Sequence, residues 1–294
     1  MNHFPQACLV FARPPNFRRA CTLFLSILAG TLQSTAAPAT KPSAGGWPNE
    51  AVCAVSLSYD DAVPVHHERV APLLEQHGLR GTFYLLVRAI DNSEAWKRVA
   101  ARGHELGNHS LFHPCRRDPG NARWLADYYD LADYTPGRFR DELAVANLVL
   151  DLLDGGRPRT YGNNCTHLTI GRGLQEQPMD SILAPMFVAA RGTITNQPVD
   201  PAQPVFTRLG HFNGDNKTFA QLRAEIEIAR ARGGWIIYMF HGVGAGTHNL
   251  FIADEEHRQL IEWLDRERAS IWTAPIVDVA RHLQASSATG SATP

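Results

Sequence analysis

Short apolar runs alternate with stretches of helical periodicity along most of the chain. The predicted strands span residues 51–58, 81–87, 104–108, 159–162, 187–190, 205–209, 235–240 and 270–274. The predicted helices lie between them, at residues 65–77, 93–102, 138–153, 218–232 and 254–267. This alternation is typical of parallel β-α units. So many parallel strands predict an α/β fold with a closed or nearly closed barrel.

Polar side chains gather where the predicted strands end. They are Asp60 and Asp61 after the first strand, His109 after the third, Asn163 and Asn164 after the fourth, and His241 after the seventh. Enzymes with parallel β/α barrels place their chemistry at the carboxyl ends of the strands. We therefore expect an active site at this end of the barrel.

The two ends of the chain differ in composition from this unit. Residues 1–37 place arginines before a short apolar run and small residues after it, which is typical of an export signal. A membrane anchor is the alternative, although the run is shorter than the ~20 residues of a spanning helix. A linker is expected over 38–47, the folded domain over 48–284 and a flexible tail over 285–294. We thus expect an exported protein, periplasmic or secreted, without stable membrane insertion after signal cleavage.

Composition and charge limit the possible partners. The chain has 294 residues, 44% of them hydrophobic and 19% charged, which is enough for one sizeable core. Its formal net charge of -1 provides no broad attraction to a polyanion. We therefore expect no nucleic-acid partner.

Three cysteines remain after removal of the predicted signal, in a compartment where disulfides form. Cys53 lies in an apolar run and is expected to be a small buried side chain. Cys115 and Cys165 each adjoin a segment with candidate site residues, so they are the favoured disulfide pair. Two unpaired buried thiols remain the alternative, because the sequence does not supply the Cα separation that a bridge needs.

Two adjacent carboxylates, Asp60 and Asp61, end the first predicted strand. Neighbouring residues of an extended chain point in different directions, so one carboxylate can bind a metal ion while the other faces the water bound to that ion. The alternative is a pair of solvated turn residues.

Two histidines, His109 and His113, lie four residues apart after the third predicted strand. Two imidazoles and a carboxylate make a ligand set that suits a catalytic zinc-like ion. The alternative is that the two histidines are close in the sequence by chance, as is expected for His66 and His67. His241 ends a buried-type strand, where a histidine can serve as a general acid or base near neutral pH; a hydrogen-bonded core histidine is the alternative.

Together, these segments resemble the NodB-homology polysaccharide deacetylases, carbohydrate esterase family four. Residues 58–62, Ser-Tyr-Asp-Asp-Ala, are similar to the family's Thr-Phe-Asp-Asp-Gly motif. Residues 109–114 match its His-Ser/Thr-x-x-His motif with the proline that follows, and residues 239–241 are similar to its Leu-x-His motif. Residues 81–84 and 103–109 are also typical of the family. The resemblance implies a distorted (β/α) barrel that hydrolyses N- or O-linked acetyl groups of a carbohydrate polymer or oligomer.

The resemblance also implies roles for particular residues. Asp60 is expected to be the catalytic base and His241 the general acid. Asp61, His109 and His113 are expected to hold one divalent metal ion. Zinc is the expected ion, with cobalt, nickel and manganese as alternatives.

The third motif of the family is altered in this chain. Residues 159–167 more closely resemble a variant branch with Tyr-Pro-Cys-Gly-His, so the usual arginine partner of the base has no assigned equivalent. We expect Asn164, Cys165 and Thr166 to form a wall of the substrate site and to supply a backbone N–H to the oxyanion. A plain turn is the alternative for Thr166.

The fourth motif, an aspartate that steadies the acidic histidine, is not evident either. Asp215 or Asp278 is a candidate for this part, and helix capping is the alternative for both. His248 is predicted to reach the substrate site from a loop.

Substrate binding is indicated only by aromatic residues after the second motif. They are Trp124, Tyr128, Tyr129 and Tyr134, which are expected either to stack on sugar rings or to pack over the barrel. Chitin-like oligomers, peptidoglycan, acetylated xylan and exopolysaccharide all fit this prediction. The competing hypotheses are a non-catalytic carbohydrate-binding protein on the same fold and an amidase or esterase for a small molecule.

Overall fold

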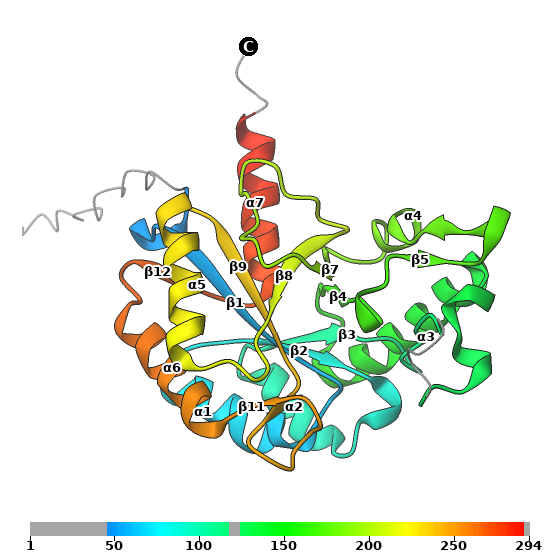
Figure 1. Ribbon diagram of the computed structural model, residues 1–294, viewed down its shortest axis with the longest axis horizontal. Coiled ribbons are helices and arrows are strands. Elements are labelled where there is room, and N and C mark those ends of the chain that lie inside the picture. Colours follow the sequence, from blue (N-terminus) through cyan, green and yellow to red (C-terminus); the bar gives the residue numbers. More distant parts are fainter. Residues whose placement is uncertain (1–45, 118–123, 291–294) are drawn as a thin grey trace, which may run out of the picture. The chain divides into compact units, whose positions relative to one another are not determined.

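A ring of parallel strands forms the centre of the molecule (Figure 1). The computed structural model describes residues 46–117 and 124–290. The ring consists of β1 (Cys53–Asp60), β2 (Thr82–Leu85), β3 (Glu105–Asn108), β4 (Tyr161–Gly162), β7 (Ala190–Ile194), β8 (Leu209–Asn213) and β9 (Trp235–Phe240). β9 pairs with β1 from Ala54 to Tyr59 and closes the ring. The α/β class and the distorted barrel expected from the sequence are therefore confirmed.

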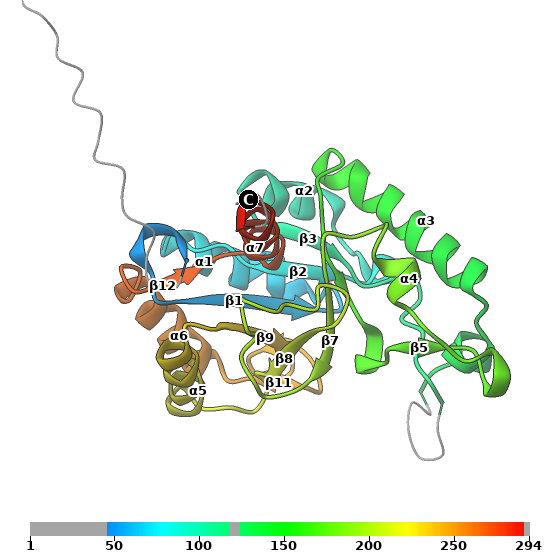
Figure 2. The same ribbon diagram turned by 90° about the horizontal axis from the view of Figure 1, so that it is seen from above.

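Helices cover the outside of this ring, and Figure 2 shows α5 and α6 on one side of β1 with α2 and α7 on the other. The helices are α1 (Ala71–Gln76), α2 (Ser93–Ala101), α3 (Pro136–Asp154), α4 (Asp180–Leu183), α5 (Phe219–Arg232), α6 (Asp254–Arg266) and α7 (Ile276–Gly290). A π-helical segment, η2 (His66–Val70), leads into α1. Short 3-10 turns are η1 (Pro48–Glu50), η3 (Val87–Ala89), η4 (Asp127–Tyr129), η5 (Leu131–Asp133), η6 (Asn164–Thr166) and η7 (Gly173–Gln175).

The remaining strands lie outside the ring. β12 (Ile271–Thr273) pairs with the first half of β1, and two small sheets join β5 (Thr169–Ile170) to β6 (Gln177–Pro178) and β10 (Gly242–Val243) to β11 (Phe251–Ile252). In the described part of the chain, no helix combines the length and apolarity that crossing a membrane requires.

Local sequence explains how the longer helices begin and end. Thr218 caps α5 through a capping box with Gln221, and Gly233 follows the helix in the left-handed conformation.

All eight residues of β1 are buried, because helices cover its outer side and the barrel interior covers the other. This packing fixes the position of the strand whose carboxyl end carries Asp60 and Asp61.

Two strands lie further along the chain than the apolar runs predicted. The expected strands at 187–190 and 205–209 end where β7 and β8 begin. The reason is that these strands carry Arg191 and His211, whose side chains are buried inside the barrel. These buried polar residues interrupt the apolar pattern, so the predicted strands end where the observed strands begin.

The boundaries of the folded domain also differ from the expectation. α7 continues to Gly290, so the tail predicted from residue 285 begins too early; the hydroxyl of Ser287 bonds to the Leu283 carbonyl one turn before it. At the other end, Trp47 is buried and its indole donates to the Gly233 carbonyl at 2.9 Å, so the predicted linker overlaps the folded part. The predicted signal, residues 1–37, lies outside the described residues.

Candidate active site

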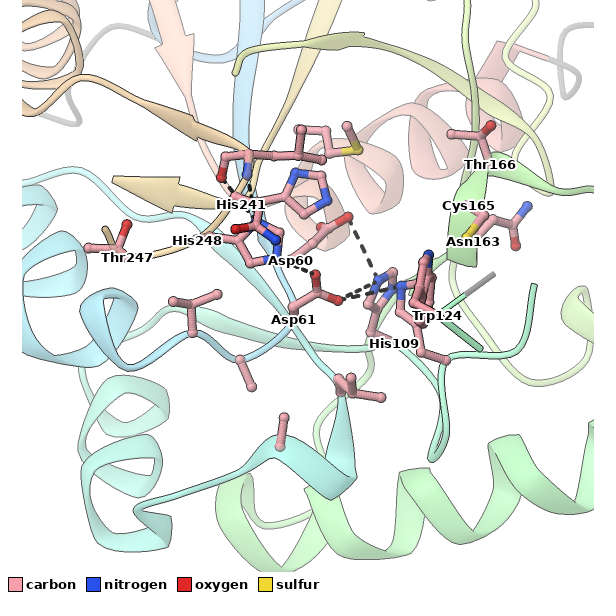
Figure 3. Close-up of a pocket in the computed structure, with 18 of the residues that line it drawn as sticks. Asp60, Asp61, His109, Trp124, Asn163, Cys165, Thr166, His241, Thr247 and His248 are labelled. Atoms are coloured by element: carbon pink, nitrogen blue, oxygen red, sulfur yellow. Dashed lines mark hydrogen bonds and ion pairs between the residues drawn. The ribbon is translucent and has the colours of Figure 1, made fainter. Parts of the chain in front are cut away.

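The two adjacent carboxylates diverge at the end of β1. Asp60 is the last residue of the strand, and its side chain is buried inside the barrel. Asp61 and Ala62 follow with φ of 76° and 55°, in the left-handed region that non-glycine residues seldom adopt. This turn separates the two side chains, so that Asp61 faces the loop that carries the two histidines (Figure 3).

The loop after β3 brings both histidines to Asp61. His109 donates from Nδ1 to the Gly162 carbonyl at 2.8 Å, which leaves Nε2 free to face the carboxylate. Oδ1 of Asp61 lies 3.5 Å from Nε2 of His109 and 3.5 Å from Nε2 of His113. Oδ1 is buried and has no hydrogen-bond partner in the described protein. The ligand set expected from the sequence therefore converges on one point.

The geometry of these three groups suits a divalent cation. Their ligand atoms all lie within 4.8 Å of one another. Oxygen and nitrogen ligands at the roughly 2.0–2.2 Å typical of zinc are about 3.4 Å apart in a tetrahedron, close to the observed 3.5 Å. Burial lowers the pKa of His113 to about 4, so the imidazole is neutral, as a metal ligand must be. Although burial opposes it, interaction with His109 holds the pKa of Asp61 well below its usual range.

Asp60 is paired with an arginine that the sequence analysis did not identify. Arg191 of β7 donates from one guanidinium nitrogen to Oδ1 of Asp60 at 2.8 Å and from another to Oδ2. Arg191 also donates to Ser58 at 2.8 Å and lies over the ring of Tyr84. Burial alone would raise the pKa of Asp60, but the charge of Arg191, with a contribution from the nearby His109 ring, lowers it to about 2. Asp60 is therefore ionised over the whole neutral range.

His241 lies on the other side of Asp61 and has its own carboxylate partner. Oδ2 of Asp215 accepts from Nδ1 of His241 at 2.6 Å, and Oδ1 accepts from the backbone N–H of His241 at 3.0 Å. Burial acts to lower the pKa of His241, but the bond to Asp215 and the charge of Asp60 raise it above the usual value. Of the two candidate aspartates, the structure brings Asp215 to His241; Asp278 is exposed on α7, and Thr218 rather than Asp215 caps α5.

His248 lies beside His241 in the loop between β10 and β11. The two rings are stacked, with centroids 5.1 Å apart and an angle of 6° between the planes. Nε2 of His248 lies 3.7 Å from Oδ2 of Asp61, so this side chain reaches the cluster as the sequence suggested.

The wall expected from the third motif is only partly placed as predicted. Cys165 and Thr166 line the cleft, but Asn164 does not. Its amide nitrogen donates to the His109 carbonyl at 3.2 Å, and its oxygen accepts from the Tyr161 hydroxyl at 3.1 Å. Asn163 lines the cleft instead, and both polar atoms of its side chain are buried without a partner in the described protein. The Asn164 side chain therefore points away from the cleft, because neighbouring side chains point to different sides of the chain.

One cleft of about 820 Å³ at the carboxyl end of the barrel is lined by the two adjacent aspartates, by the four histidines His109, His113, His241 and His248, and by Asn163, Cys165 and Thr166. Three apolar side chains on its border, Trp124, Ile194 and Leu250, are exposed. Tyr134 is buried and donates to Glu142 at 2.8 Å, and Tyr129 stacks on Phe112. Of the four aromatic residues considered for sugar stacking, only Trp124 lines the cleft.

The cysteines take the arrangement that the sequence favoured. Cys115 and Cys165 form a disulfide with a Cα–Cα distance of 5.8 Å. Cys53 is a free buried cysteine in β1. Because the disulfide uses both sulfurs, the nearby trio of His113, Cys115 and Cys165 is not a metal site in this state of the protein.

Comparison with known proteins agrees with this geometry. A family model described as polysaccharide deacetylase matches residues 49–163. A gellan lyase from Bacillus sp is 24% identical over 261 residues, which covers 81% of this chain and 10% of that protein. A peptidoglycan-N-acetylglucosamine deacetylase from Bacillus cereus is 27% identical over 110 residues, which covers 36% of this chain and 34% of that protein. The chain therefore spans about a third or less of the length of these two relatives.

Solved structures share the fold. A candidate polysaccharide deacetylase from Mycobacterium smegmatis superposes with a TM-score of 0.59 at 17% identity, over 86% of this chain and 95% of that one. The sequence match includes the end of β1, the loop with both histidines and the start of the wall. Residues 49–163 are therefore similar in sequence to the polysaccharide deacetylase family, and the barrel shares its fold with the Mycobacterium smegmatis structure.

Proposed function

We propose that this protein is a metal-dependent deacetylase that removes N- or O-linked acetyl groups from a carbohydrate polymer or oligomer. The observation that carries the proposal is the position of Asp61 between two acid-base groups. Asp61, His109 and His113 form a cation-sized cluster, Asp60 lies on one side of it and His241 on another.

The residues present fit a resident divalent cation, because Asp61 offers a buried oxygen without a hydrogen-bond partner among the described residues. Asp61, His109 and His113 would hold the ion. Zinc is the ion that this ligand set suits first, with cobalt, nickel and manganese as alternatives. When bound there, the cation would polarise an acetyl carbonyl and lower the pKa of a water molecule.

Asp60 and His241 divide the proton transfers. Asp60 accepts a proton from the attacking water, whose oxygen forms a bond to the acetyl carbon. His241, whose pKa is raised by the bond to Asp215, donates a proton to the departing nitrogen or oxygen. The acyl bond breaks, and the products are acetate and a free amine or alcohol. Arg191 and Asp215 keep the two acid-base groups in orientation.

The wall of the cleft is proposed to stabilise the negative charge that develops on the acetyl oxygen. Asn163, Cys165 and Thr166 line the cleft there. A single well-placed donor of this kind contributes about 3 to 4 kcal/mol to such reactions.

A carbohydrate substrate is supported by the form of the cleft and by a relative. The cleft of about 820 Å³ has exposed apolar side chains on its border, among them Trp124, on which a sugar ring can stack. The relative from Bacillus cereus is a peptidoglycan-N-acetylglucosamine deacetylase. The altered third and fourth motifs favoured a non-catalytic protein. That alternative is weakened, because Arg191 pairs with Asp60 and Asp215 pairs with His241.

We also propose that the protein acts outside the cytoplasm, in the periplasm or as a secreted protein. The predicted signal and the disulfide both fit an oxidising compartment.

Acetate release tests the proposal. The zinc-loaded protein would be incubated with acetylated chitin oligomers, peptidoglycan fragments, acetylated xylan and acetylated exopolysaccharide. Release from at least one of them should stop on chelation and return with zinc. Asp60→Asn should keep zinc but lose activity by about 10²- to 10⁴-fold. Release that neither chelation nor Asp60→Asn affects would reject the proposal, and glycan binding without release would favour the non-catalytic alternative.

A further inference from the structure

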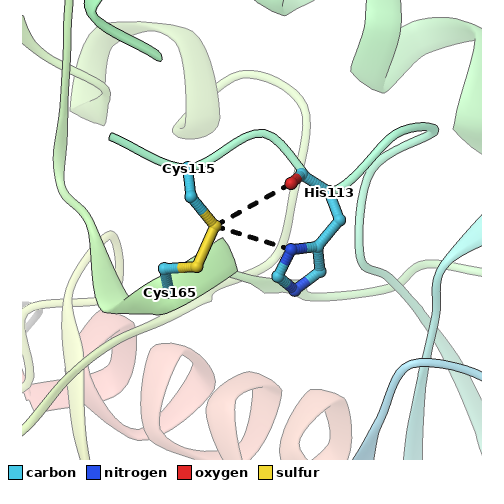
Figure 4. Close-up of side chains that lie close together, drawn as sticks. All are labelled: His113, Cys115 and Cys165. Carbon is cyan, nitrogen blue, oxygen red and sulfur yellow. Dashed lines mark hydrogen bonds between the residues drawn. A yellow bond between two sulfur atoms is a disulfide. The ribbon is translucent and has the colours of Figure 1, made fainter. Parts of the chain in front are cut away.

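A disulfide lies directly behind one member of the cation cluster. Cys115 follows His113 by two residues, and its Sγ lies 3.5 Å from Nδ1 and 3.8 Å from the carbonyl oxygen of His113. Figure 4 shows this sulfur on the side of the imidazole that carries Nδ1, while Nε2 is the atom near Asp61. Cys165, on the other half of the bridge, lines the cleft. The bridge therefore connects a candidate ligand loop to the wall of the same cleft.

Both connected loops have an unfavourable backbone conformation. His113 has φ of 58°, and Cys165 and Thr166 have φ of 50° and 58°. Each such non-glycine residue costs on the order of 1–3 kcal/mol and persists only where its surroundings hold it. Six of the ten non-glycine residues with positive φ in the described chain lie at this site: Asp61, Ala62, Ser110, His113, Cys165 and Thr166.

Noncovalent contacts also act on His113 and its loop, and its ring packs against those of His109 and Trp124. Its backbone N–H donates to the Ser110 hydroxyl at 2.9 Å, which is a contact within the same loop. Two hydrogen bonds also join the two loops, one from the Arg116 backbone N–H to Nδ1 of His167 at 3.1 Å and one from the Asn164 amide to the His109 carbonyl at 3.2 Å. The disulfide is the covalent link between them, across a sequence separation of 50 residues.

We propose that the Cys115–Cys165 disulfide is a redox-sensitive positioning element that holds His113 in the geometry for cation binding. This inference rests on the proposed function, because it concerns the same cation site. A dithiol reductant can approach through Cys165, which lines the cleft. It transfers two electrons and two protons to the bridge, leaves two thiols and departs as its own disulfide. The loop of His113 then gains conformations in which Nε2 no longer faces Asp61.

The expected consequence is weaker cation binding without loss of the fold. Groups that orient metal ligands typically change metal affinity by about 10- to 100-fold when they are removed. The opposite result is also physically possible, because the freed thiols and Nδ1 of His113 would together form a soft ligand set. The two outcomes differ in the sign of the change in zinc affinity.

The test compares zinc affinity between oxidised and bridge-free protein. Zinc dissociation constants would be measured by competition with a fluorescent chelator for the oxidised wild type and for the double variant Cys115→Ser/Cys165→Ser. Reduced wild type would be measured before and after re-oxidation. Cys53→Ser is the matched control, since it removes a buried cysteine outside the site. Circular dichroism would establish that each variant keeps the barrel.

The double variant is expected to bind zinc about 10- to 100-fold more weakly than the oxidised wild type. The zinc affinity of Cys53→Ser should match that of the wild type. Re-oxidation of the reduced wild type should return its zinc affinity to that of the oxidised protein. An affinity of the folded double variant within about twofold of wild type would overturn the proposal. So would tighter zinc binding by reduced wild type, because the thiols would then be ligands themselves.

A second measurement decides the proposal without any metal. Amide hydrogen exchange in the metal-free double variant should be faster in residues 109–115 and 163–167 but unchanged in β9. Unchanged exchange in both loops would refute the positioning role even if the protein bound no zinc. Failure of the oxidised wild type to bind zinc would instead count against the proposed function.

Discussion

Arg191 holds both carboxylate oxygens of Asp60, although 131 residues separate the two in the sequence. Both side chains are buried, so the charge of each depends on the other for compensation. The pair keeps Asp60 ionised and fixed beside His109, with Oδ2 of Asp60 3.8 Å from Nε2 of that ring. The residue proposed as the base thus has its position and its charge set by one distant arginine.

Replacing Arg191 by glutamine should therefore affect both stability and pH dependence. Breaking a buried pair from one side typically costs about 3–5 kcal/mol, because the other charge remains uncompensated. The pair holds the pKa of Asp60 at about 2, below its value in an unfolded chain, so its stabilisation is present at neutral pH and is lost as the pH falls toward 2. Without Arg191, burial raises the pKa of Asp60. The acidic limb of kcat/KM should then move to higher pH, which pH–rate profiles and denaturant unfolding would measure.

Arg208→Gln is the control for this change. Arg208 pairs with Asp180 at an exposed position away from the cleft. Surface pairs of this kind contribute about 0–1 kcal/mol, so stability and the pH profile should change little. Equal effects of the two substitutions would contradict a special role for Arg191.

Asp215→Asn tests whether the general acid depends on its carboxylate partner. The bond from Asp215 raises the pKa of His241, so its loss lowers that pKa, and His241 is deprotonated at a lower pH. The alkaline limb of the kcat profile should therefore move to lower pH. The value of kcat should fall by up to the ~10²- to 10⁴-fold that a general acid contributes.

Asp278→Asn is the matched control, because Asp278 was the other candidate aspartate and lies on α7 outside the cleft. The pH profile of kcat for Asp278→Asn should match that of the wild type. A shift of the alkaline limb in Asp278→Asn but not in Asp215→Asn would reverse the assignment.

Asp60, His109 and His241 lie at the strand ends where the sequence predicted them, because each is next to or at the end of a clearly apolar strand. His241 directly follows β9, whose observed bounds match the predicted 235–240. Asp60 ends β1, and His109 follows β3. Local pattern is enough to find such positions.

Arg191 lacked this signal because it lies within a strand rather than after one. In the sequence, the arginine inside β7 interrupts an apolar run and looks like the end of a strand. Its proximity to Asp60 follows only from the closed ring of strands. Asn163 and Asn164 show a second limit. Their positions in sequence are equivalent, and the local backbone alone decides which side chain faces the cleft.

Asp61→Asn should remove cation binding while preserving the turn. Asparagine tolerates the positive φ of this position, but its neutral amide is a weaker ligand than a carboxylate. Zinc at about 100 times its dissociation constant stabilises a binding protein by about 2.7 kcal/mol, which corresponds to roughly 5–10 °C in Tm at this size. The wild type should show this increase and Asp61→Asn should not.

Thermal unfolding with and without zinc, together with metal analysis, would check this result. Asp91→Asn is the control, because this aspartate bonds to His67 outside the cleft. One zinc per chain in wild type and Asp91→Asn is expected. Full zinc occupancy of Asp61→Asn would show that the cation does not depend on this carboxylate.

Trp124 and Tyr128 provide a matched pair for the question of sugar stacking. Their exposed fractions are almost equal, 63% and 64%, but only Trp124 lines the cleft, with its ring centroid 5.5 Å from that of His113. Aromatic stacking contributes about 0.5–1.5 kcal/mol, so Trp124→Ala should raise KM for an acetylated oligosaccharide by about 2- to 12-fold with little change in kcat. Tyr128→Ala should leave KM unchanged. Steady-state kinetics on an oligomer series would measure KM and kcat for both variants. Equal changes in KM for Trp124→Ala and Tyr128→Ala would show that the effect does not depend on a position in the cleft.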